Sequence, residues 1–85
     1  MRFVTIIWDS EGDPDGNVLH VAEHGLEPAD VEFVIENADS DSKSRTSGRP
    51  CLFGYTPDGV YIIVIYEQAD QDTIYPVTAY EVREP

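Results

Sequence analysis

The residues best suited to chemistry gather in one short segment, residues 42–49. Lys43, Arg45 and Arg49 are three of the five cations of the chain. Planar guanidinium groups match phosphate or carboxylate oxygens, and nearby hydroxyls such as that of Ser47 add further donors. The segment therefore predicts a site for phosphate or another anion. The alternative is a solvated loop whose cations only offset an acidic body.

Two histidines, His20 and His24, stand four residues apart, which places them on one face of a helix. RNA cleavage without a metal needs a base near the 2′-hydroxyl, an acid at the leaving oxygen and cations at the phosphate. His24, or else His20, is the candidate base, and Arg45 and Arg49 are the candidate phosphate contacts. The same spacing suits a zinc ion if a third ligand is present. The alternative is that both histidines are ordinary helix residues that bind nothing.

An acidic stretch copies the front half of a calcium-binding loop. Glu11, Asp13 and Asp15 alternate and are followed by Gly16. Such a loop also needs a bidentate carboxylate six residues after the glycine, and Ala22 occupies that position. We therefore predict an exposed polar turn here, and we predict neither a metal nor a cofactor for the chain.

Aromatic residues recur along the predicted strands. Rings at alternate positions of adjacent strands share one face, where they can stack on bases. Tyr66 and Tyr80 are therefore candidate ligand contacts, together with Lys43 and Ser47. Packing of these rings under the helices is the alternative. The set comprises Trp8, Tyr55, Tyr61, Tyr66, Tyr75 and Tyr80.

The charge balance restricts the class of partner. Seventeen acidic residues stand against five Lys and Arg in 85 residues, giving a formal charge of −12. Such a field repels nucleic acids and anionic membranes, so weak or no generic nucleic-acid binding is expected. Apolar residues make up 41% of the chain, too many for a disordered acidic tail. A small acidic globular domain follows.

A single cysteine, Cys51, excludes a disulfide within the chain and a cysteine-rich metal site. The apolar run of residues 3–8 is shorter than a signal peptide or a membrane span requires. We therefore expect a cytoplasmic protein with no membrane association and one domain over residues 1–85. The sequence leaves the oligomeric state open.

Hydrophobic patterning predicts the order β-α-α-β-β-β. Two short helices, the first capped by Asn17 and the second carrying Val31, Val34 and Ile35, should pack on one face of a mostly antiparallel four-stranded sheet. This is an α+β fold, in which Pro76 predicts an edge or a bulge in the last strand. The expected strands are residues 3–8, 51–55, 60–66 and 73–82, the expected helices are 18–24 and 28 to about 37, and 39–50 is expected to be a loop.

Several short sequence motifs follow one another in a recognisable order along these elements. They are Trp8-Asp9, His24-Gly25-Leu26, Arg49, Gly54, Asp58-Gly59 and Val64-Ile65-Tyr66. In the motifs and their order the chain resembles the BrnT family. Members of this family are small bacterial toxins of type II toxin–antitoxin pairs, with a fold similar to that of the RelE/ParE ribonucleases. The resemblance implies that fold, a ribonuclease activity and a neutralising antitoxin as partner.

The chain departs from the family pattern where the family carries cations. Glu23 stands in place of the helix lysine, and Tyr80 in place of the last-strand arginine. Two hypotheses follow. The chain is a divergent BrnT-like ribonuclease toxin, bound by a basic antitoxin. Alternatively, it is a non-catalytic protein-interaction domain on the same scaffold.

Overall fold

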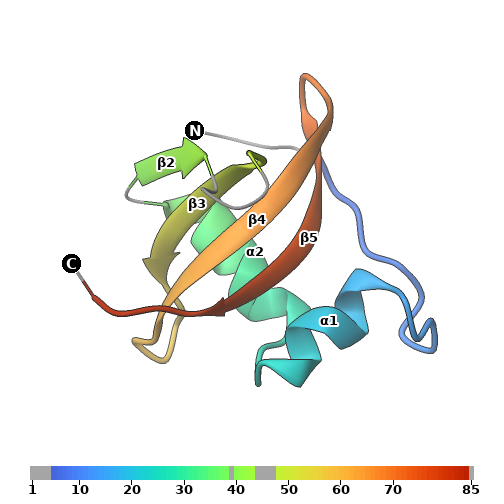
Figure 1. The fold of residues 1–85 in the computed structure, drawn as a ribbon, viewed down its shortest axis with the longest axis horizontal. Coiled ribbons are helices and arrows are strands. Elements are labelled where there is room, and N and C mark those ends of the chain that lie inside the picture. Colours follow the sequence, from blue (N-terminus) through green and yellow to red (C-terminus); the bar gives the residue numbers. More distant parts are fainter. Residues whose placement is uncertain (1–4, 39, 44–47, 85) are drawn as a thin grey trace.

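A computed structural model describes residues 5–38, 40–43 and 48–84. Its elements are β1 (Thr5–Ile6), α1 (Asn17–Glu23), α2 (Pro28–Asn37), β2 (Ser40–Lys43), β3 (Pro50–Tyr55), β4 (Tyr61–Asp70) and β5 (Thr73–Glu81) (Figure 1). The strands form one sheet in the order β1-β5-β4-β3-β2. Only β1 and β5 run parallel, and the other neighbours are antiparallel. The predicted α+β class and the mostly antiparallel sheet are confirmed.

Within the described residues the sheet has five strands, where the sequence predicts four. The additional strand, β2, lies within the predicted loop of residues 39–50, and it pairs Ser42 with Cys51 and Lys43 with Pro50. Serine and aspartate have little strand preference of their own, so β2 owes its conformation to the edge that β3 presents. The loop prediction is therefore wrong for residues 40–43.

The hairpin between β4 and β5 is longer than the sequence predicts. Residues 67–70, which lie between the two expected strands, continue β4, and the turn is confined to Gln71 and Asp72. The predicted irregularity at Pro76 is confirmed as a bulge, because Ile65 pairs with Thr78 while the next residue of β4 pairs with Pro76. A bulge accommodates a residue that has no N–H to donate to the ladder.

Local chemistry accounts for the end of α1 and for the start of α2. Gly25, with φ of +79°, follows α1 in the left-handed conformation that glycine adopts most readily. Pro28 opens α2, and the Asp30 carboxylate accepts a hydrogen bond from the backbone N–H of Glu27 at 2.9 Å, as part of a capping box. These signals place α2 within one residue of its predicted bounds.

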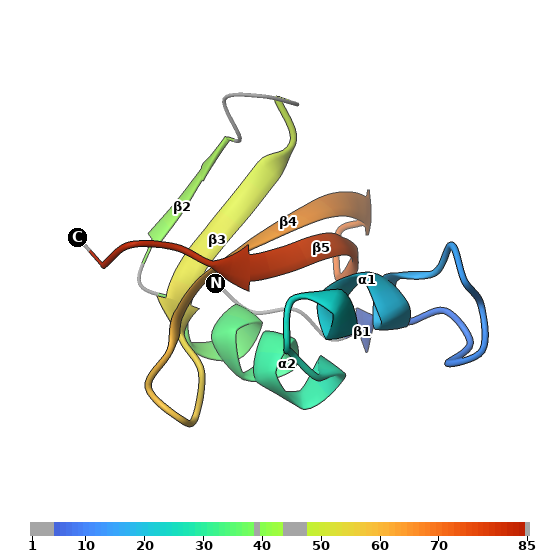
Figure 2. The ribbon, with the colours of Figure 1, turned by 60° about the horizontal axis from the view of Figure 1, so that its bottom comes forward.

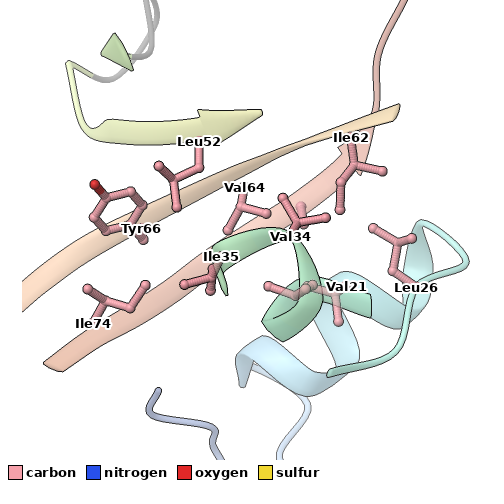
Figure 3. Packing of buried hydrophobic residues seen from close by; sticks show 11 residues of the cluster. Val21, Leu26, Val34, Ile35, Leu52, Ile62, Val64, Tyr66 and Ile74 are labelled. Carbon is pink, nitrogen blue, oxygen red and sulfur yellow. The ribbon is translucent and has the colours of Figure 1, made fainter. Parts of the chain in front are cut away.

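Both helices lie on one side of the sheet, which we call the helix face (Figure 2). Val31, Val34 and Ile35 of α2 are at most 1% exposed, so the predicted apolar stripe is confirmed. Burial of each such side chain stabilises the fold by about 1.5–3 kcal/mol. The helix comes close to the sheet at Gly54, where a Cβ would lie 3.1 Å from Val34 Cγ1. The core cluster comprises Val21, Leu26, Val31, Val34, Ile35, Leu52, Ile62, Val64, Tyr66, Ile74 and Ala79 (Figure 3).

Candidate functional site

A second apolar cluster lies on the opposite side of the sheet, which we call the open face. Cys51, Ile63 and Ile65 form its centre and are 1%, 8% and 8% exposed. Phe53, Tyr80 and Val82 pack against this centre and remain partly exposed. Neither described helix lies on this side (Figure 2). The open face is therefore an apolar surface within the described part of the chain, bounded by aromatic rings.

Three aromatic rings, those of Phe53, Tyr61 and Tyr55, form a row at one end of the open face. The ring centroids of Phe53 and Tyr61 are 6.2 Å apart, and those of Tyr61 and Tyr55 are 4.8 Å apart. Tyr55 donates a hydrogen bond from its hydroxyl to a carboxylate oxygen of Glu84 at 2.7 Å. Large rigid rings with a polar edge are the side chains most enriched at protein contact surfaces.

The candidate base, His24, lies beside this face. It ends α1 as the C-cap residue, and its ring centroid is 5.5 Å from that of Tyr80. The side chain of His24 is exposed. The structure thus brings together two predicted site residues, His24 and Tyr80, through the packing of α1 against β5.

The candidate phosphate contact, Arg49, lies at a different position on the open face. Its Nε is 3.4 Å from Oε2 of Glu67, and the two side chains are 44% and 56% exposed. An ion pair this exposed contributes little to stability, about 0–1 kcal/mol. Because a carboxylate faces this guanidinium, a phosphate would have to compete with Glu67 for it.

The strand register separates these two positions. Tyr80 pairs with Ile63, whereas Glu67 lies four residues further along β4 and pairs with Tyr75. Four residues of a strand span roughly 13 Å. His24 thus lies beside one position of the sheet, and Arg49 lies beside a position four residues further along β4.

A polar cluster of Asp9, Asn17 and Tyr75 lies next to Glu67 and was not predicted. Oδ2 of Asp9 accepts hydrogen bonds from the Tyr75 hydroxyl at 2.5 Å and from the backbone N–H of Asn17 at 3.0 Å. Oδ1 of Asn17 accepts the backbone N–H of Asp9 at 2.9 Å. Gly16 is required beside this cluster, because a Cβ there would lie 2.7 Å from Cβ of Asp9.

Asn17 also ties this cluster to the sheet. Its side-chain amide donates to the carbonyl oxygens of Ile7 at 3.0 Å and Pro76 at 2.8 Å, and the residue is 1% exposed. The prediction that Asn17 caps α1 is therefore wrong. Gly16 is the N-cap residue, and no side chain caps the helix. The buried amide satisfies both of its donors with these two carbonyls, which the helix end would not allow.

The hydrogen bond between Asp9 and Tyr75 sets the ionisation of both groups. The bond from Tyr75, followed by that from the Asn17 backbone, lowers the pKa of Asp9 below its ordinary 3.8. The same hydrogen bond, which Tyr75 donates to Asp9, raises the pKa of Tyr75 from 10.0 to about 12. Burial and the nearby charges of Asp13 and Glu67 act in the same direction. At neutral pH Asp9 is therefore charged and Tyr75 is a neutral donor, so neither is poised to exchange a proton.

Of the other predicted site residues, Tyr66 lies on the opposite side of the sheet. Tyr66 is 4% exposed and packs in the core of the helix face, as the packing alternative predicts (Figure 3). Lys43 ends β2, where its backbone pairs with Pro50. Arg45 and Ser47 lie outside the described residues.

The metal hypotheses find no support in the described ranges. Over residues 5–38, 40–43 and 48–84, no group of three or more His, Cys, Asp or Glu side chains is arranged to hold an ion. The predicted polar turn is present instead, since Oδ1 of Asp13 accepts the backbone N–H of Asp15 at 2.9 Å. No described helix is long and apolar enough to cross a membrane.

The open face was missed, although the sequence carries a signal for it. Cys51 and Phe53 alternate along β3, as Ile63 and Ile65 do along β4, and alternate residues share a face of a sheet. The signal is hidden in β4, because residues 62–66 are apolar without a break and period two is lost. The polar cluster had no such signal, since Asp9 and Tyr75 are 66 residues apart.

Comparison with known proteins adds no relative. No protein-family model matches the chain, and neither a curated protein nor a solved structure is similar to it.

Proposed function

We propose that this chain is a protein-interaction domain without catalytic activity, and that it binds a basic protein in the cytoplasm. The observation that carries the proposal is that His24 contacts Tyr80 whereas Arg49 contacts Glu67, four residues further along β4 than the partner of Tyr80. Cleavage of RNA without a metal requires a base and phosphate-binding cations at the same phosphate. Here the candidate base and the described candidate cation lie at separate positions on the sheet.

The charge of the chain supports a basic partner. A formal charge of −12 attracts a cationic surface over long range and raises the rate of encounter with it. The same field opposes the approach of RNA. An antitoxin of the kind paired with BrnT proteins is the partner that the sequence resemblance suggests, and ribonuclease activity is the competing proposal.

Two assays on the full chain separate these proposals. We expect no growth arrest on induced expression and no cleavage of total RNA by the purified protein. Growth arrest that His24→Ala or Arg49→Ala abolishes, together with RNA cleavage lost in the same variants, would replace the interaction proposal with the ribonuclease.

The partner is sought by co-expression with the product of the adjacent gene. We expect a basic protein that co-elutes with the chain. The complex should form again from the two purified proteins and dissociate as the salt concentration rises. An acidic partner, or a complex insensitive to salt, contradicts the charge argument.

A further inference from the structure

We propose that the open face is the surface on which a basic, amphipathic segment of a protein partner docks. This inference rests on the proposed function and locates its binding surface. The partner segment is defined by its chemistry, namely apolar or aromatic side chains in the middle and arginine or lysine at both ends.

The middle of the open face provides the apolar contact. Ile63 and Ile65 are each 8% exposed, so a partner meets mainly the rings and methyl groups that cover them. These are the partly exposed side chains of Phe53, Tyr80 and Val82. Aromatic rings bury a large area at low entropic cost, and their faces attract guanidinium and ammonium groups.

Carboxylates lie at both ends of this apolar surface. Glu84 is at one end, hydrogen-bonded to Tyr55, which contacts Tyr61. Glu67 is at the other end, where it faces Arg49. Three carboxylates lie close enough to Tyr75 at this end for their charges to raise its pKa. That set comprises Asp9, Asp13 and Glu67. Among the described side chains at this end, Arg49 offsets one of these three charges.

The register sets the spacing of the cations. Tyr61 and Glu67 are six residues apart on β4, which corresponds to roughly 20 Å. An extended segment with basic residues about six positions apart therefore reaches both acidic ends while its middle covers the rings.

Charge selects this occupant over a second copy of the chain. Two copies would each bring a formal charge of −12 to the interface. Like charges disfavour such a pairing, whereas a cationic segment gains from both acidic ends. Self-association through the open face is accordingly an outcome that the test must detect.

The experiment titrates a synthetic peptide into the ¹⁵N-labelled full chain. The peptide is about ten residues long, with a Leu- and Tyr-containing middle and arginines about six positions apart. A second peptide of the same composition has its arginines in the middle. We expect amide shifts confined to β3, β4 and β5 around the open face, and about tenfold weaker binding of the rearranged peptide.

A pair of matched variants locates the contact. Phe53→Lys places a cation on the open face, and Phe33→Lys places the same cation on the outer side of α2, where Phe33 is 40% exposed. We expect Phe53→Lys to weaken peptide binding at least tenfold and Phe33→Lys to weaken it less than about twofold. Equal effects of the two variants, or shifts centred on α2, would overturn the docking surface.

A second pair avoids any risk that Phe53→Lys disturbs the fold. Glu67→Gln removes an exposed carboxylate from one end of the open face, and Glu36→Gln removes an exposed one from α2. We expect Glu67→Gln to weaken binding about threefold at low salt and Glu36→Gln to leave it nearly unchanged. The inference fails if the two variants bind alike.

The outcomes distinguish this inference from the proposed function. If the peptide binds all four variants with the affinity of the unsubstituted chain, the docking surface is contradicted, and the proposed interaction function is not. No binding of either peptide and no basic partner in co-expression would contradict both. A dimer by light scattering that Phe53→Lys dissociates would assign the open face to a second copy.

Discussion

The two faces of the sheet bury apolar residues in different ways. On the helix face, Ile62 and Val64 lie under α2 and are fully buried. On the open face, the partly exposed side chains of Phe53, Tyr80 and Val82 pack against Ile63 and Ile65. Adjacent residues of one strand thus serve two environments. The helix face provides stability, and the open face keeps apolar area available for contact.

The most severe test of this difference compares two neighbouring isoleucines. Ile62→Ala should cost about 4 kcal/mol of unfolding free energy, because the cavity lies between β4 and the helices and cannot collapse easily. Ile63→Ala should cost about 2 kcal/mol, because the surrounding side chains can close over the gap. Urea unfolding of both variants measures the difference. Equal losses would mean that the faces are equally packed.

The next largest effect concerns the polar cluster. Asn17→Ala should cost about 2 kcal/mol, because the carbonyl oxygens of Ile7 and Pro76 lose their buried donor. Asn37 is the matched control, since its amide also donates to a backbone carbonyl, that of Phe33, but in an exposed position. Asn37→Ala should change stability by less than about 0.5 kcal/mol in the same assay. A small loss for Asn17→Ala would mean that water replaces its bonds.

A pH dependence should follow from Tyr75 at the edge of the open face. Below pH 10 its hydroxyl is protonated in the folded and unfolded chains, so the stabilising contribution is fully present. Between pH 10 and about 12 the unfolded chain loses the proton first, and stability falls as pH rises. Denaturation at a series of alkaline pH values measures this loss, which should be smaller in Tyr75→Phe.

The same hydrogen bond predicts an acidic limb. The pKa of Asp9 is lower in the folded chain than its ordinary value of 3.8. The contribution of Asp9 to stability is therefore fully present above pH 3.8 and is lost as the pH falls through the pKa of the folded chain. Tyr75→Phe should reduce this acid-induced loss as well. A substitution that changes neither limb would show that the Asp9–Tyr75 bond contributes nothing to folding.

The smallest effect is expected for the exposed ion pair. Arg49→Gln removes the contact with Glu67 and should change unfolding free energy by less than about 1 kcal/mol, because both side chains are highly exposed. Thermal melting at low and high salt measures it. A loss as large as that of Ile63→Ala would give this pair a structural role and blur the distinction between the two faces.

Local chemistry accounts for what the sequence predicts correctly. The stripe of Val31, Val34 and Ile35 follows helical periodicity, and Gly25 and Pro28 mark helix ends by their own backbone preferences. These signals need no knowledge of distant residues. The α+β class follows from them, together with the strand-like composition of residues 60–66.

Contacts between distant segments account for what the sequence misses. β2 is a strand because β3 lies beside it, and Asn17 turns away from the helix end because Ile7 and Pro76 present carbonyls. Arg49 and His24 are individually recognisable as candidates, but their separation depends on the register of β3, β4 and β5. No local pattern contains that register.

The parallel pairing of β1 with β5 joins the first described strand to the last. Asn17 and Pro76, which bond across this junction, are 59 residues apart, and Asp9 and Tyr75 are 66 apart. During synthesis, the segment after β1 and the start of α1 can bond to each other, but they wait for β5 before they acquire their partners on that strand. Closing so long a loop is entropically costly, so this junction should form late in folding. The amino-terminal quarter of the chain thus depends on the ribosome having finished the carboxy-terminal strand.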